Sequence, residues 1–151
     1  MDLGMIVKRA TLEDLEQLAV LFDEYRQFYG ASANIKQSYQ FLKHRFDNKE
    51  SVIFIHVKDN VFTGFVLLYL AFSSVACETY YIIDDVYVTP SYRKQGSAKQ
   101  LIDTAILFAR HENALRISLE TQKNNIESHR LYEQMGFMRD DEFNTFHCFL
   151  K

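Results

Sequence analysis

Two adjacent carboxylates, Asp84 and Asp85, begin the segment of this 151-residue chain that is best suited to chemistry. They precede an apolar run and then a polar turn that leads into small and basic residues: Val86, Val88, Arg93, Lys94, Gln95, Gly96, Ser97, Ala98 and Lys99. A helix that begins at such small residues presents unpaired N–H groups and the positive end of its dipole, which suits an anion. The basic side chains add charge for phosphates. The pattern favours an anion-binding strand–turn–helix, and an ordinary strand–turn–helix with surface basic residues is the alternative.

Two common phosphate-binding loops do not fit this segment. The sequence lacks G-x-x-x-x-G-K-[ST] and also G-x-G-x-x-G, which disfavours a P-loop nucleotide hydrolase and a dinucleotide-binding enzyme. The five histidines and the two cysteines show no metal-ligand spacing, so no metal is expected. Cys77 and Cys148 are expected to be free, buried thiols.

The elements that must position this segment follow from hydrophobic periodicity and turn residues. The sequence predicts strands at 5–9, 52–58, 61–72, 80–88, 115–119 and 143–150, and helices at 11–29, 35–47, 98–109 and 124–135. The resulting order, β-α-α-β-β-β-α-β-α-β, predicts an α/β (or α+β) sheet with helices on its faces. With one Pro, five Gly and no linker, residues 1–151 are expected to form one domain.

Composition limits the partners. The net charge of −3 disfavours nucleic acid and anionic membrane surfaces as partners, and it is compatible with a cationic substrate. No apolar run approaches the ~18 residues that a membrane span needs. Without a signal-peptide pattern, the protein is expected to be soluble and cytoplasmic.

Two motifs resemble one known family. The run Arg93-Lys94-Gln95-Gly96-Ser97-Ala98 resembles the [RQ]-x-x-G-x-[GA] signature of the GNAT superfamily, the acetyl-CoA-dependent N-acetyltransferases, and Val86–Pro90 matches the strand before it. Further on, Asn125 and then Leu131-Tyr132-Glu133-Gln134-Met135-Gly136-Phe137 resemble the family's N-x(5)-L-Y-x-x-x-G-F helix. The resemblance implies a mixed sheet of about six to seven strands, splayed in the middle and flanked by about four helices.

The resemblance also implies how acetyl-CoA, the cosubstrate, would be held. The main chain of Val86 and Val88 would pair with the pantetheine arm as an added strand would. The amides from Gln95 to Lys99, through Gly96, Ser97 and Ala98, would hold the pyrophosphate. Arg93 and Lys94 would line the route to the nucleotide, and Asn125 would lie beside the arm.

The implied reaction is direct attack of an amine on the thioester, which needs a base and an acid. The resemblance makes Tyr132 the general acid, and a core tyrosine is the alternative. Strand alternation predicts that Asp84 lies on the side of Val86 and Val88 while Asp85 points to the other side. Asp84, at a position where some relatives carry glutamate, would take the amine's proton through water, or would only bind a cationic substrate.

The substrate is expected to be a primary amine of a small molecule: a polyamine, a diamine or an amino-acid-like amine, by loose similarity to polyamine acetyltransferases. Phe28, Tyr29 and Asp85 are the candidate contacts, although aromatic residues at helical spacing are also typical of core. A protein or peptide amine is one alternative, and a non-catalytic acyl-CoA sensor is another. A homodimer is possible because dimers are common in the superfamily.

Overall fold

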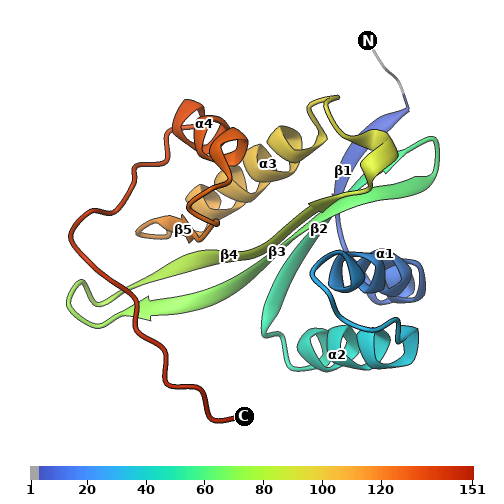
Figure 1. The fold of residues 1–151 in the computed structure, drawn as a ribbon, viewed down its shortest axis with the longest axis horizontal. Coiled ribbons are helices and arrows are strands. Elements are labelled where there is room, and N and C mark those ends of the chain that lie inside the picture. The colour runs from blue at the N-terminus through green and yellow to red at the C-terminus, as the bar shows by residue number, and fades with distance from the viewer. Residues whose placement is uncertain (1–3) are drawn as a thin grey trace. The chain divides into compact units, whose positions relative to one another are not determined.

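The computed structural model describes residues 4–151 and divides the chain into two compact units, 1–120 and 121–151, which are treated one at a time. The elements (Figure 1) are β1 (Met5–Arg9), α1 (Leu15–Phe28), α2 (Ile35–Asp47), β2 (Ser51–Lys58), β3 (Val61–Ser73), β4 (Glu78–Val88), α3 (Ser97–His111), β5 (Ile117–Leu119) and α4 (Ile126–Gln134), with 3-10 turns at Leu12–Asp14 and Pro90–Tyr92. Up to residue 134 every predicted element is present, with bounds moved by a few residues.

The first unit is built on one sheet with the order β1-β2-β3-β4-β5. The first four strands pair antiparallel; short turns join β2 to β3 and β3 to β4, whereas α1 and α2 lie between β1 and β2. β5 pairs parallel to β4, and α3 provides the long crossover that a parallel pair requires. This ladder holds only three residue pairs, from Tyr81↔Ile117 to Ile83↔Leu119, so β4 continues beyond its neighbour.

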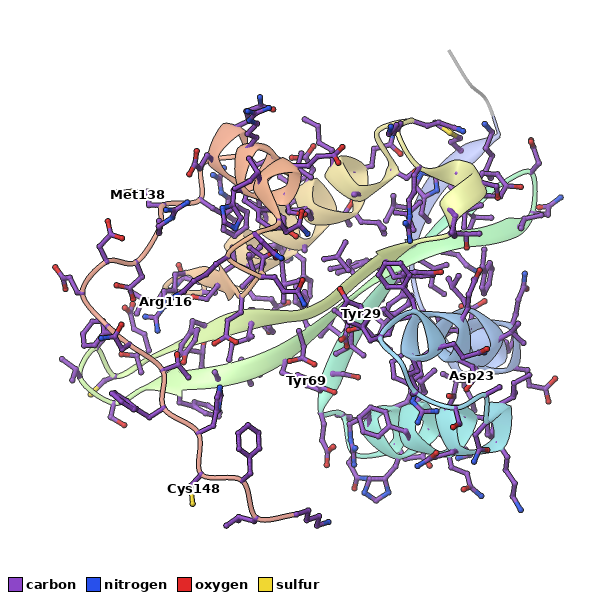
Figure 2. The ribbon with its side chains drawn as sticks, viewed as in Figure 1. Asp23, Tyr29, Tyr69, Arg116, Met138 and Cys148 are labelled. Atoms are coloured by element: carbon purple, nitrogen blue, oxygen red, sulfur yellow. The ribbon has the colours of Figure 1, made fainter. Side chains whose placement is uncertain are left out.

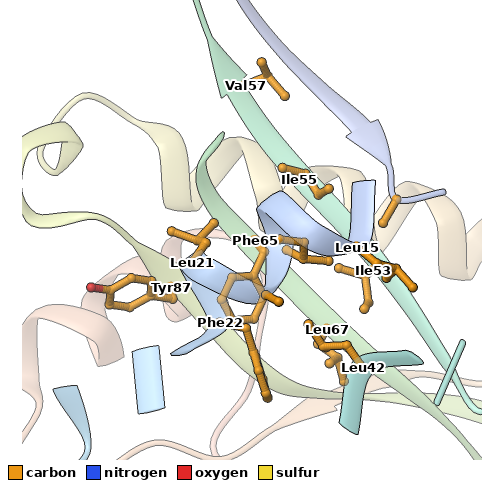
Figure 3. Packing of buried hydrophobic residues seen from close by; sticks show 13 residues of the cluster. Leu15, Leu21, Phe22, Leu42, Ile53, Ile55, Val57, Phe65, Leu67 and Tyr87 are labelled. Atoms are coloured by element: carbon orange, nitrogen blue, oxygen red, sulfur yellow. The ribbon is translucent and has the colours of Figure 1, made fainter. Parts of the chain in front are cut away.

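The helices α1 and α2 cover one face of this sheet (Figure 1). Leu15, Leu18 and Phe22 recur at helical spacing along α1 and are buried in one cluster with Ile55 and Phe65 of the sheet. Figure 3 shows Leu15 and Phe22 beside these strand residues. Burying one such side chain stabilises the fold by about 1.5–3 kcal/mol. The core therefore fixes α1 over β3 and β4.

The helix α3 covers the opposite face (Figure 1). Leu101, Ile102 and Ala105 are fully buried there. Gly64 of β3 allows close packing, because a Cβ at this position would lie 2.6 Å from the carbonyl oxygen of Tyr87 and 3.3 Å from Leu101. The start of α3 is thereby held close to the sheet.

The second unit contains α4. Its N-cap is Asn125, whose side chain accepts a hydrogen bond from the Ser128 amide at 3.2 Å. The helix ends before Gly136, which adopts a φ of 97°. In the described chain no helix has the length and apolar character needed to cross a bilayer.

The predicted last strand, 143–150, is wrong: residues 138–151 contain no helix or strand, and Phe146 and Phe149 are 90% and 85% exposed. Apolar and aromatic residues in such a run predict a strand that fits a sheet, but a strand forms only where it finds a partner. Within residues 4–151 the sheet therefore has five strands, fewer than expected, while the α/β class is confirmed. The two cysteines, expected to be buried, are free and exposed.

Candidate active site

A β-bulge in β4 shapes the candidate site. Leu68 of β3 pairs with Ile83 while Leu67 pairs with Asp85, so Asp84 is an extra residue without a ladder partner. Asp84 is exposed, and Asp85 is only 9% exposed, on the face that α1 covers. The uniform alternation assumed from the sequence is therefore interrupted at Asp84, because a bulge shifts the side-chain period by one residue.

A buried hydrogen bond joins Asp85 to α1: the Tyr25 hydroxyl donates to Asp85 Oδ1. Burial raises the pKa of Asp85 to about 6; the Tyr25 bond lowers this pKa, and the adjacent Asp84 carboxylate raises it. Burial, followed by the Asp85 bond, also raises the pKa of the Tyr25 phenol, which stays protonated. A carboxyl group poised near neutral pH, with its donor fixed, is typical of functional sites.

Tyr69 of β3 extends this group on the same face (Figure 2). Burial, together with the charges of Asp84 and Asp85, raises the pKa of Tyr69 to about 12. The Asp84 carboxylate thus acts on the same tyrosines as Asp85. The two carboxylates and two phenols form one polar cluster, hereafter the acidic cluster: Tyr25, Tyr69, Asp84 and Asp85.

Aromatic rings surround the acidic cluster. Tyr29, at the end of α1, lies 5.1 Å from the ring of Tyr25 and 5.2 Å from that of Phe28 (Figure 2). Tyr87, two residues after Asp85, lies 5.7 Å from Tyr25 and 6.1 Å from Phe28. Phe28 and Tyr29 are more than half exposed. The structure brings these two candidate residues together with the rings around Asp85.

Arg93 reaches this aromatic group from the turn after β4. Its guanidinium carbon lies 5.1 Å from the Phe28 ring centre and 5.5 Å from that of Tyr87, and Nε donates to the Val88 carbonyl at 2.8 Å. Arg93 was expected on the route to a nucleotide. In the structure its head group lies over Phe28 and Tyr87.

The other edge of β4 offers main-chain groups. The Thr89 amide donates to Thr63 of β3 at 2.8 Å, and main-chain groups alternate between the two edges of a strand. The N–H and C=O of Val86 and Val88 therefore point away from β3, and of these the Val88 carbonyl accepts from Arg93 Nε. The β5 ladder ends at Ile83, so in the described chain no strand pairs with this part of β4. An extended ligand can add to this edge.

The turn after β4 leads to the N-terminus of α3. Gly96 has a φ of 82° and Lys94 a φ of 61°. The Gln100 amide makes the first helical bond, to the Gly96 carbonyl at 3.0 Å. Within residues 4–151, the amides of Ser97, Ala98 and Lys99 donate no hydrogen bond to a protein acceptor, so they are available for an anion. Gln95 and Lys99 direct their side chains elsewhere, to Lys58 and Asp103.

The second unit holds two more candidates. Asn125 caps α4 through its Oδ1, and Tyr132 lies within that helix with its ring 5.8 Å from the ring of Phe137. Across the described residues, no group of three or more His, Cys, Asp or Glu side chains is arranged to hold a metal ion.

Sequence reasoning missed the partnership of Tyr25 and Tyr69 with the carboxylates. Tyr25 falls in the apolar stripe of α1, and its hydroxyl was the only sign that this position needs a polar partner. Tyr69 lies in an apolar run whose register with β4 depends on the bulge.

A β4 strand that extends beyond its parallel neighbour, followed by a helix with open N-terminal amides, suits an extended ligand that carries an anionic group. Residues 18–137 match the acetyltransferase (GNAT) family. This chain belongs to that family.

Individual relatives agree with this assignment. The chain is 36% identical over 139 residues to the uncharacterized N-acetyltransferase YhfO of Bacillus subtilis (strain 168), covering 92% of this chain and 93% of the relative. It is 31% identical over 125 residues to a probable acetyltransferase of Haemophilus influenzae, covering 82% of this chain and 84% of the relative. A crystal structure of a probable acetyltransferase, 36% identical, superposes with a TM-score of 0.91 over 97% of this chain and 98% of its own.

Proposed function

We propose that this protein transfers the acetyl group of acetyl-CoA to a primary amine of a small cationic molecule, by direct attack of the amine. The observation that carries this proposal is the acidic cluster, whose Tyr25 packs against the rings of Tyr29 and Tyr87. Its two carboxylates lie on β4, which has no strand partner beyond Ile83 on the β5 side. Carboxylates attract a protonated amine, and aromatic faces hold cations and alkyl chains alike.

The donor side would be formed mostly by main chain. When bound, acetyl-CoA supplies the activated acetyl thioester. The open edge of Val86 and Val88 would pair with the amide-bearing arm, and the amides of Ser97–Lys99 would hold the pyrophosphate. These groups fit an extended, phosphate-bearing ligand, because they combine unpaired strand amides with an unpaired helix N-terminus. Lys94 would add charge, and Asn125 would lie beside the arm.

The acceptor side would supply the base. Asp84, exposed at the bulge, would meet the ammonium form of the substrate. Asp85, with a pKa near 6, would take the proton as the amine nitrogen bonds to the acetyl carbon. The sequence points to Asp84 as the base; we propose Asp85 because it is buried, is hydrogen-bonded by Tyr25 and has a pKa raised to about 6.

The acid would be Tyr132, on the basis of its place in the L-Y-x-x-x-G-F motif. As the carbon–sulfur bond breaks, the Tyr132 hydroxyl would give its proton to the departing thiolate. The ammonium form loses a first proton to water before it attacks, and the attacking nitrogen loses a second to Asp85 as the amide forms. The thiolate gains one from Tyr132, and Asp85 and Tyr132 then re-equilibrate with water. This role requires both units to act as one functional domain, residues 1–151, which we also propose, in the cytoplasm where acetyl-CoA is available.

Release of free CoA thiol with a panel of amines tests this proposal. Polyamines, diamines and amino acids are compared with aminoglycosides and short peptides, and calorimetry measures acetyl-CoA binding on the same sample. We expect turnover with a small cationic amine and its loss in Asp85→Asn. Turnover with peptides alone would overturn the small-molecule assignment, and tight acetyl-CoA binding with every amine inert would indicate a sensor.

A further inference from the structure

A buried polar chain connects the sheet to the start of α3. His56 of β2 is 1% exposed and Thr63 of β3 is fully buried. His56 Nδ1 lies 2.7 Å from Thr63 Oγ1, and Nε2 lies 2.8 Å from Gln100 Oε1 in the first turn of α3. Because the Gln100 oxygen is an acceptor, Nε2 carries a ring proton, and the Thr63 hydroxyl lies between Nδ1 and the His56 carbonyl, 2.7 and 3.2 Å from them.

The polar chain of His56, Thr63 and Gln100 differs from the side chains around it. Most side chains buried between α3 and the sheet are apolar, among them Leu101, Ile102, Phe54 and Leu68. Burying an imidazole and a hydroxyl stabilises nothing unless their hydrogen bonds are satisfied, and packing alone would be met by an apolar side chain. The polar chain therefore fixes how α3 is positioned on the sheet and does not serve only to fill space in the core.

The polar chain fixes the position of the first turn of α3. The Gln100 amide bonds to the Gly96 carbonyl at 3.0 Å, so Gln100 closes the same turn that presents the amides of Ser97, Ala98 and Lys99. A bulge aids this arrangement: His56 pairs with Gly64 and Val57 with Phe62, which leaves Thr63 as an extra residue beside His56.

We propose that His56 and Gln100 are positioning residues for the pyrophosphate of acetyl-CoA, an inference that rests on the proposed function. Neither side chain needs to touch the cosubstrate. Their bond sets the height and rotation of the first turn of α3 above the sheet, and therefore the direction of its open amides. Hydrogen bonds to an anion depend steeply on this direction.

Gln100→Met tests the proposal, since methionine keeps the length of glutamine and removes the acceptor. Two donors are compared: acetyl-CoA, and S-acetylpantetheine, which lacks the pyrophosphate and nucleotide. We expect KM for acetyl-CoA and Kd for CoA to rise about tenfold, kcat at saturating acetyl-CoA to stay the same, and kcat/KM for S-acetylpantetheine to be unchanged. His56→Phe should act in the same way, and the double variant should be little worse than either single one.

Thr104→Val is the matched control. Thr104 donates to the main-chain oxygen of Gln100 at 2.9 Å, so this change removes a bond to the same residue without releasing it from the sheet. Its KM for acetyl-CoA should equal that of the wild type. If Gln100→Met loses activity equally with both donors, or with neither, the positioning role is overturned. If the wild type itself turns over no acetyl thioester, the proposed function has failed instead.

Discussion

On the face of β4 that α1 covers, the groups suited to chemistry are side chains. At the edge of β4 that points away from β3, and at the start of α3, they are main-chain amides and carbonyls. The acidic cluster draws Tyr25 from α1 and Tyr69 from β3 to two carboxylates of one bulge. The donor side relies on strand ends, on Gly96 and on a helix start. Substitutions on the first side should therefore change the chemistry of the acceptor, whereas the second side should respond mainly to changes that move the backbone.

The largest effect is expected from Asp85→Asn, which keeps shape and burial but removes the base. We expect kcat to fall about 10²- to 10⁴-fold. Because the ionised form is active and its pKa is about 6, wild-type kcat/KM should rise with pH and level off above pH 6, and the variant should lose this limb. A pH–rate profile measures both. Asp84→Asn should cost less; a larger loss there would exchange the roles of the two carboxylates.

Tyr132→Phe should give the next largest effect. Removing the hydroxyl leaves the ring and its contact with Phe137 in place. We expect kcat to fall about 10- to 100-fold, because the thiolate then has no acid, while CoA binding by calorimetry stays the same. An unchanged kcat would remove Tyr132 from the mechanism.

Gly96→Ala probes the main-chain side. The φ of 82° is costly for alanine by about 1–2 kcal/mol, although a Cβ would meet no atom within 4 Å. If the strain moves the turn, KM for acetyl-CoA should rise about 5- to 30-fold with little change in kcat. Gly30→Ala is the matched control, since its φ is 92° and its Cβ is equally uncrowded, but it lies after α1. Equal effects on acetyl-CoA would break the distinction between the two sides.

Tyr25→Phe should have the smallest effect and sharpen the assignment of the base. The Tyr25 bond lowers the pKa of Asp85, so its loss raises that pKa and moves the rising limb of kcat/KM to higher pH. At pH 6 the variant should be about threefold slower, and above about pH 8 it should match the wild type. Tyr39→Phe, on α2, should leave the profile in place. A limb that moves to lower pH would contradict the assignment.

Much of the fold could be predicted because its signals are local. Gly30 and Gly136 end helices, Leu15, Leu18 and Phe22 follow the helical period, and the turn at Asp59-Asn60 marks the β2–β3 hairpin. The last strand failed for the opposite reason. Phe146 and Phe149 suit a sheet, but whether a strand forms depends on a partner that is distant in sequence.

The candidate site divides in the same way. By itself the sequence determined the contiguous parts: the two carboxylates at the end of a strand, the small residues at the start of α3 and the motif around Tyr132. Only the tertiary structure decided that Asp85, and not Asp84, is buried with Tyr25, because one unpaired residue in a ladder reverses every side-chain direction beyond it. The same holds for His56 and Gln100, which are 44 residues apart and meet only when α3 packs on the sheet.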